Sequence, residues 1–185
     1  MREMVRISSV PLTIVLCGAL GGCGGGRYEA GMHYEPQPAL VEVLHRTGTA
    51  PQQVPLTVLA SVKGVRPVDA NTGTPPAVEL RLRFENHGPS HVEFEPDSLE
   101  LTTGALRDFP RPRVRPPAPV ALSPGQSQTV TVLFPLPAGL DARSAELDHL
   151  RLRWRVVVNG QSVPQTALFV RDSGARGMSN DPLSG

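Results

Sequence analysis

Apolar and polar residues alternate with a period of two along several short stretches of the chain. Residues 78–84 and 150–158 show the alternation best, with valine, leucine, phenylalanine and Trp154 separated by charged residues. This pattern is typical of an antiparallel strand that buries one face and exposes the other. Shorter stretches of the same kind occur at 56–62, 92–94, 99–101 and 130–134. The pattern predicts an all-β domain with Trp154 in its core.

Turn-forming residues separate these stretches. Pro96-Asp97-Ser98 and Ser123-Pro124-Gly125 are typical turn sequences. Asn159-Gly160, between two β-like runs, predicts a hairpin with a type I′ turn. Pro164 in the second strand of that hairpin fits a sheet edge, because proline has no N–H for the ladder. Only residues 142–149 suggest a helical turn.

Strands and turns of this kind fill residues 53–171. Seven or eight short strands without a useful helical period predict an Ig-like antiparallel β-sandwich over that range. The flanking residues are rich in glycine, proline and polar types. We therefore expect 23–52 to be a flexible tether with a reach of about 30 Å, and 172–185 to be a disordered tail.

The N-terminus has the features of a signal peptide, which we assign to residues 1–22. Residues 1–6 carry two arginines and one glutamate, and residues 10–20 form an apolar stretch. That stretch is too short to span about 30 Å of hydrocarbon as a helix, which argues against a single transmembrane anchor. A plainly cleaved secretory peptide is the other alternative.

Leu20-Gly21-Gly22-Cys23 resembles the lipobox of bacterial lipoproteins at all four positions. The resemblance implies cleavage before Cys23 and attachment of acyl chains to that residue, so that lipid anchors the mature chain in a membrane. Cys17 does not fit, because the bulky Leu16 precedes it. Glycine rather than aspartate follows Cys23, which favours the periplasmic face of the outer membrane if the cell is Gram-negative.

Three short sequences between residues 78 and 136 carry a second resemblance. They are Phe84-Glu85-Asn86 before Gly88, Leu99-Glu100-Leu101, and Leu122-Ser123-Pro124-Gly125 leading into 129–134. This stretch resembles the Ig-like domains of bacterial lipoproteins, including the family related to a mycobacterial secreted antigen. The resemblance implies the fold and supplies no functional residue.

Composition narrows the classes of function. Both cysteines lie at or before Cys23, so the globular part has no disulfide and no thiol nucleophile. The chain has 18 Lys+Arg and 17 Asp+Glu, and removing Arg2, Arg6 and Glu3 with residues 1–22 leaves 16 of each. This balance gives no global attraction to nucleic acid. No nucleophile elbow, HExxH or phosphate-binding glycine loop occurs, so we expect neither a cofactor nor enzyme activity.

His87 and His91 are the candidate metal ligands. They flank a Gly-Pro-Ser turn, and Glu93 and Glu95 follow. Two imidazoles with a carboxylate suit Zn²⁺ or Cu²⁺. Because Pro89 prevents a helix, no regular structure places these groups on one face. The alternative is a solvated turn.

Residues 109–119 are the most unusual segment, with five prolines interleaved by Arg111, Arg113 and Arg115. Proline at this density predicts polyproline II. A pre-extended cationic arm would bind an acidic or aromatic-lined partner surface. The alternative is a stiff crossover between strands whose arginines keep it soluble.

Two strands carry arginines on one face. Arg151, Arg153 and Arg155 alternate with apolar residues, as do Arg81 and Arg83. If these two strands were neighbours, ladders with the flanking glutamates would account for the arginines. The alternative is a patch for an anionic ligand, such as a phosphate.

The sequence therefore predicts an exported, lipid-anchored protein of the cell envelope. Its expected role is that of a non-enzymatic binding or assembly module. Its partners would be the membrane through Cys23 and an envelope protein or anionic surface, without nucleic acid. The alternatives are a small-ligand or metal carrier, and an envelope hydrolase or protease inhibitor.

Overall fold

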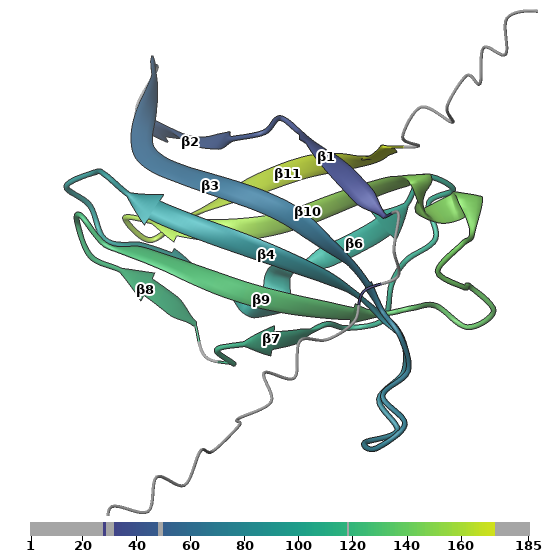
Figure 1. The fold of residues 1–185 in the computed structure, drawn as a ribbon. Coiled ribbons are helices and arrows are strands. Elements are labelled where there is room, and N and C mark those ends of the chain that lie inside the picture. Colours follow the sequence, from purple (N-terminus) through teal and green to yellow (C-terminus); the bar gives the residue numbers. More distant parts are fainter. Residues whose placement is uncertain (1–27, 29–31, 48–49, 118, 173–185) are drawn as a thin grey trace, which may run out of the picture.

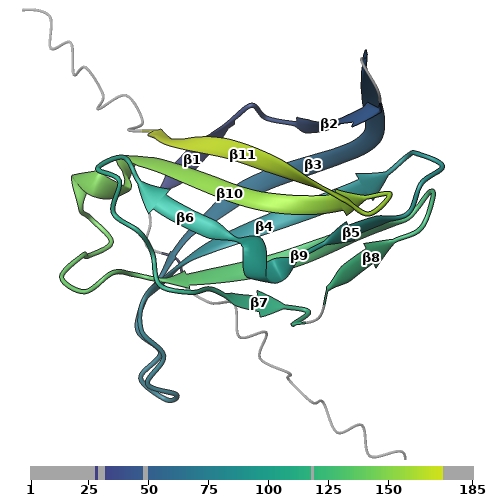
Figure 2. The same cartoon turned by 180° about the vertical axis from the view of Figure 1, so that it is seen from behind.

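The computed structural model describes residue 28 and residues 32–47, 50–117 and 119–172. Within these residues the strands pair antiparallel and form two sheets that pack face to face (Figure 1, and from behind Figure 2). The predicted all-β sandwich is confirmed. The proposed signal peptide, Cys23 and the tail after Asp172 lie outside the described residues.

Each sheet combines strands from distant parts of the chain. Sheet A has the order β1-β11-β10-β5-β8, with β6 also pairing with β10, and sheet B has the order β2-β3-β4-β9-β7. The bounds are β1 His33–Gln37, β2 Val41–Thr47, β3 Ala50–Arg66, β4 Ala77–Asn86, β5 Val92–Phe94, β6 Glu100–Thr103, β7 Arg113–Arg115, β8 Val120–Leu122, β9 Ser127–Pro135, β10 His149–Val158 and β11 Gln161–Asp172, with 3₁₀ turns η1 at Pro96–Ser98 and η2 at Ala145–Asp148.

The described residues hold eleven strands rather than seven or eight, because β1, β2, β7 and β8 were not anticipated. The predicted tether, 23–52, is wrong for residues 33–47 and for the start of β3. Strand β1 pairs with β11 at the far end of the chain, and β2 pairs with β3. Tyr34, Val41 and Val43 are buried, and this burial against distant strands is invisible in the local composition.

The inner faces of the sheets form one apolar core. Trp154 is 1% exposed and lies on β10, as the alternation predicted. The rings of Phe84 on β4 and Phe94 on β5 lie 4.7 Å apart between centroids and join the two sheets. Glu79 is the exception to the predicted pattern on β4, since it is fully buried although it faces outward.

The predicted turns of the C-terminal half are confirmed. Asn159 and Gly160 have φ values of 51° and 76° and close the β10–β11 hairpin, as a type I′ turn requires. Pro164 pairs with Arg155 in a part of β11 that β1 does not reach, so it has an edge position. The suggested helical turn is η2, whose first N–H groups are capped by the Ser144 hydroxyl, which accepts from the Glu146 N–H.

Asn86, which ends β4, holds the loops at one end of the sandwich. Its side-chain amide donates to the carbonyls of Ser90 at 2.8 Å and Leu122 at 3.1 Å, and its Oδ1 accepts from the Gly88 N–H. The residue is 1% exposed, so these bonds satisfy a polar group that would be costly to bury alone. The β4–β5 loop therefore has a defined course.

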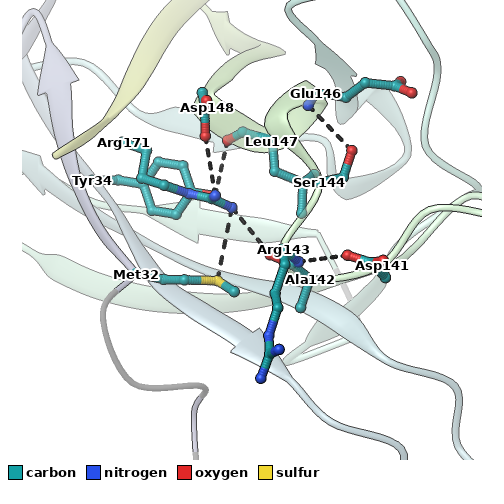
Figure 3. A network of polar contacts seen from close by, with 10 residues as sticks. All are labelled: Met32, Tyr34, Asp141, Ala142, Arg143, Ser144, Glu146, Leu147, Asp148 and Arg171. Atoms are coloured by element: carbon teal, nitrogen blue, oxygen red, sulfur yellow. Dashed lines mark hydrogen bonds and ion pairs between the residues drawn. The ribbon is translucent and has the colours of Figure 1, made fainter. Parts of the chain in front are cut away.

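Arg171 fastens β1 to the other end of the sandwich (Figure 3). Its guanidinium forms an ion pair with Asp148 at 3.0 Å and donates to the carbonyl of Ala142 at 3.1 Å and the hydroxyl of Tyr34 at 3.4 Å. The Tyr34 hydroxyl donates to the Leu147 carbonyl at 2.9 Å. Burial raises the pKa of Tyr34, so the phenol keeps the proton that it donates. The N-terminal strand is thus part of the domain.

Candidate functional site

A groove of about 670 Å³ lies over the outer face of sheet A, where β10 begins and β11 ends. We call it the sheet A groove. The turn after β6 forms one wall and η2 forms another. Its volume is in the range of small-molecule sites. The residues that line it are Gln37, Thr103, Gly104, Ala105, Leu106, Ala145, Glu146, His149, Leu150, Arg151, Leu168, Phe169 and Val170.

Leu106 stands at the lip of this groove in an unusual conformation. Its φ is 61°, and its side chain is 68% exposed. Hydrogen bonds across the turn, from the Leu106 N–H to the Thr103 carbonyl and from the Thr103 N–H to the Arg107 carbonyl, impose this backbone. A left-handed leucine costs about 1–2 kcal/mol relative to an ordinary conformation. An exposed apolar side chain held at that cost points to a function other than stability.

Replacing Leu106 with glycine is therefore expected to leave the free energy of unfolding unchanged or to raise it by up to about 1 kcal/mol. Glycine relieves the left-handed strain, and little buried surface is lost. The matched control is Leu59→Gly, at a 40% exposed leucine inside β3, which is expected to cost about 1 kcal/mol. Urea denaturation of the variants checks this, and equal destabilisation by the two substitutions would show that the turn is not strained.

Polar groups occupy one side of the groove. Arg151 on β10 lies opposite Leu168 on β11, and His149 lies opposite Val170. Glu146 of η2 forms an ion pair at 3.6 Å with Arg107. Within the described residues Arg151 has no carboxylate partner. The groove thus combines apolar walls with a cation whose charge is not matched by a neighbour.

His87 and His91 lie at the opposite end of the sandwich, in the loop that Asn86 organises. Both are exposed, and His87 Nε2 is 3.4 Å from Oε2 of Glu85. In the described part of the chain no three His, Cys, Asp or Glu side chains lie close enough together to hold a metal ion. The described residues therefore do not assemble a three-ligand site around the predicted pair.

The proline-arginine segment does not form one polyproline arm. Arg113–Arg115 is β7, an edge strand that pairs with β9, because Val114 packs against the core between the two arginines. Arg111 instead forms an ion pair with Asp97 of η1. The three predicted arginines are therefore split, and only Arg113 and Arg115 share a face.

The two arginine-bearing strands are not neighbours, so the predicted ladder between them is wrong. Arg81 and Arg83 lie on β4 in sheet B, whereas β10 lies in sheet A. The β4 arginines pair along their own strand, with Arg83 Nε 2.7 Å from Glu85 and Arg81 Nε 3.6 Å from Glu79. Arg151, Arg153 and Arg155 form no ion pair within the described residues.

A second, smaller space of about 190 Å³ lies on the outer face of sheet B, and we call it the basic pocket. Arg66, Arg113 and Arg115 line it together with Asp69 and the 72–75 turn. Hydrogen bonds from the Thr72 side chain and the Asn71 N–H lower the pKa of Asp69, so this carboxylate stays ionised. Arg66 is paired with the buried Glu79, so Arg113 and Arg115 against Asp69 leave the pocket positive.

No protein-family model matches the chain, and no curated protein proves similar to it in sequence. None of the helices in the described residues is long and apolar enough to cross a membrane.

Both spaces depend on contacts that sequence reasoning missed. The sheet A groove joins a turn at 104–106 to η2 some forty residues later, and the alternation along the strands does not reveal that approach. One signal was present. Leu106 is a large apolar residue that directly follows Gly104 and Ala105. The end of a strand does not require a large apolar residue at such a position.

Proposed function

We propose that the chain is an exported lipoprotein, matured at Cys23, whose β-sandwich is a non-enzymatic binding module of the cell envelope. The anchor is supported by the short apolar stretch at 10–20 and by the lipobox resemblance of Leu20-Gly21-Gly22-Cys23. Two or more acyl chains give durable attachment, whereas one chain alone is marginal. Glycine rather than aspartate at position 24 favours the periplasmic face of the outer membrane if the cell is Gram-negative.

The sheet A groove is the proposed binding surface. The single observation that carries this assignment is Leu106, an exposed leucine kept in a left-handed conformation at the lip of a 670 Å³ space. Apolar surface from Ala105, Leu106 and Leu168 faces this space. Removal of such surface from water on binding contributes about 25 cal/mol per Å².

The charged side of the groove indicates the chemistry of the ligand. Arg151 lacks an acidic partner among the described residues, and its guanidinium presents several N–H donors to an incoming carboxylate or phosphate. Glu146 is already paired with Arg107. The proposed ligand is thus amphipathic, with an acidic group beside Arg151 and an apolar part against Leu106 and Leu168.

A photoreactive benzoylphenylalanine in place of Leu106 tests this proposal in intact cells. We expect a discrete adduct, whether small ligand or partner segment, and we expect that this adduct is not formed by the same probe in place of Leu59, which is similarly apolar on the other face. Adding Leu168→Glu to the Leu106 probe places a carboxylate beside Arg151 and should reduce the adduct about tenfold or more. Adding Leu59→Glu should not. Equal adducts from both probes, or none from position 106, would rule out the groove.

A further inference from the structure

The N-terminal segment rests on sheet B as well as sheet A. Tyr28 covers Gly64 of β3, and a Cβ at that glycine would lie only 3.4 Å from Cβ and Cδ1 of the tyrosine. The guanidinium of Arg66 lies over the Tyr28 ring, 5.9 Å from its centroid. Tyr28 on sheet B and β1 on sheet A, which Arg171 fastens, thus attach the N-terminal part of the chain at two places on opposite sheets.

This attachment leaves little free chain before the domain. Only four residues, 24–27, separate Cys23 from Tyr28. Five Cα–Cα steps span at most about 18 Å even when fully extended. A lipid on Cys23 would therefore hold the Tyr28 end of the sandwich at the headgroups, rather than about 30 Å away as a tether over residues 23–52 would allow.

The surface beside Tyr28 is basic. Outward-facing residues that pair across neighbouring strands of sheet B form rows that run across the sheet. The three rows nearest to Tyr28 contain four arginines and one carboxylate. The carboxylate, Glu79, is buried beneath Arg66 and Arg81, which pair with it. Arg113 and Arg115 have no carboxylate partner within the described residues. We call the four arginines the basic face: Arg66, Arg81, Arg113 and Arg115.

The other side of the sandwich has no such excess. On the outer face of sheet A, three arginines on β10 share the surface with four carboxylates on neighbouring strands. Those carboxylates are Glu35, Glu93, Glu100 and Asp172. The positive charge is thus concentrated on the sheet that Tyr28 covers and at the end where Tyr28 lies.

We propose that the basic face docks on anionic phospholipid headgroups and fixes the orientation of the domain on its membrane. The inference rests on the proposed lipid attachment at Cys23. Basic residues beside an acyl anchor increase the affinity of a protein for an anionic membrane. Each arginine near the surface strengthens attachment about fivefold. The basic pocket, between Arg66, Arg113 and Arg115, is large enough to admit a headgroup phosphate. In this orientation the sheet A groove stays open to water.

The orientation is measured with the purified lipidated protein in vesicles made with or without phosphatidylglycerol. The mature chain has no cysteine other than the lipidated one, so Thr131→Cys and Thr166→Cys each carry a single dye. Thr131 lies between Arg81 and Arg115 on sheet B, and Thr166 lies opposite Arg153 on sheet A. A spin label on the lipid headgroups quenches a dye that lies near them.

We expect strong quenching at position 131 in phosphatidylglycerol vesicles and little at position 166. Arg113→Gln with Arg115→Gln should lower the docked-to-undocked ratio about twentyfold or more, whereas Arg153→Gln with Arg155→Gln removes the same charge from sheet A and should leave quenching at 131 unchanged. Added salt should weaken docking. Equal quenching at both positions, or quenching independent of phosphatidylglycerol, overturns the proposed orientation while vesicle flotation shows the anchor intact. Loss of flotation overturns the lipid attachment itself.

Discussion

Replacing Cys23 with alanine is expected to abolish acylation of the chain and to leave residues 1–22 attached. The thiol is the proposed site of the lipid, and the proposed cleavage lies directly before the same residue, so one substitution is expected to block both steps. Incorporation of labelled palmitate should fall to background, and a larger precursor should accumulate on gels. No other single substitution is expected to change the fate of the chain so completely.

The chain supplies its own control for this experiment. Cys17→Ala removes the other cysteine, which follows the bulky Leu16 rather than Gly22, and should leave labelling and processing unchanged. Palmitate incorporation that persists in Cys23→Ala would exclude the proposed site. Normal cleavage of an unlabelled Cys23→Ala chain would instead favour a plain secretory peptide.

Trp154→Ala is expected to have the largest effect on stability, with a loss of about 3–5 kcal/mol in the free energy of unfolding. The side chain is 1% exposed and is the largest in the core. Its removal leaves a cavity between the sheets that rigid neighbouring strands cannot fill. Since domains of this size are stable by about 5–15 kcal/mol, much of the population would unfold at moderate denaturant.

Trp154→Phe separates packing from hydrogen bonding at this position. The indole N–H of Trp154 makes no hydrogen bond within the described residues, so phenylalanine also removes a buried polar group whose burial costs about 1–3 kcal/mol. We therefore expect a much smaller loss than for alanine. Because Trp154 is the only tryptophan, unfolding is followed by circular dichroism rather than fluorescence. Equal losses in the two variants would contradict a packing role for the indole.

The sequence predicts the strands that bury one face in the core and expose the other face to solvent. Strands β4 and β10 alternate over most of their length, and each apolar position that the period assigned to the core, from Val78 to Phe84 and from Leu150 to Val158, is buried. The turn at Asn159-Gly160 was also predictable, because its geometry depends on two adjacent residues.

Other parts depend on contacts that no local pattern encodes. Residues 33–37 become a strand because β11 offers them an edge, and Arg171 secures Tyr34. Residues 113–115 pair with β9 although prolines surround them. Glu79 follows the outward period of β4, yet Arg66 and Arg81 cover it. The positions of these residues are set by segments distant in the chain.

The same limit applies to the candidate site. The arginines at 111, 113 and 115 are adjacent in sequence but serve different surfaces, since Arg111 pairs with Asp97 while the other two face outward from sheet B. The groove at Leu106 forms only when the turn after β6 meets η2. Sequence identified residue types suited to binding, and the topology determined which of them share a surface.

The proposed function depends first on lipid at Cys23, which would anchor this β-sandwich in the cell envelope. The most direct test is intact-mass and peptide mass spectrometry of the chain extracted from bacterial membranes. We expect a mature N-terminus at Cys23, without residues 1–22, carrying a diacylglyceryl group and usually a further acyl chain. An unmodified Cys23, whether in a chain cleaved elsewhere or in one that retains residues 1–22, would contradict it.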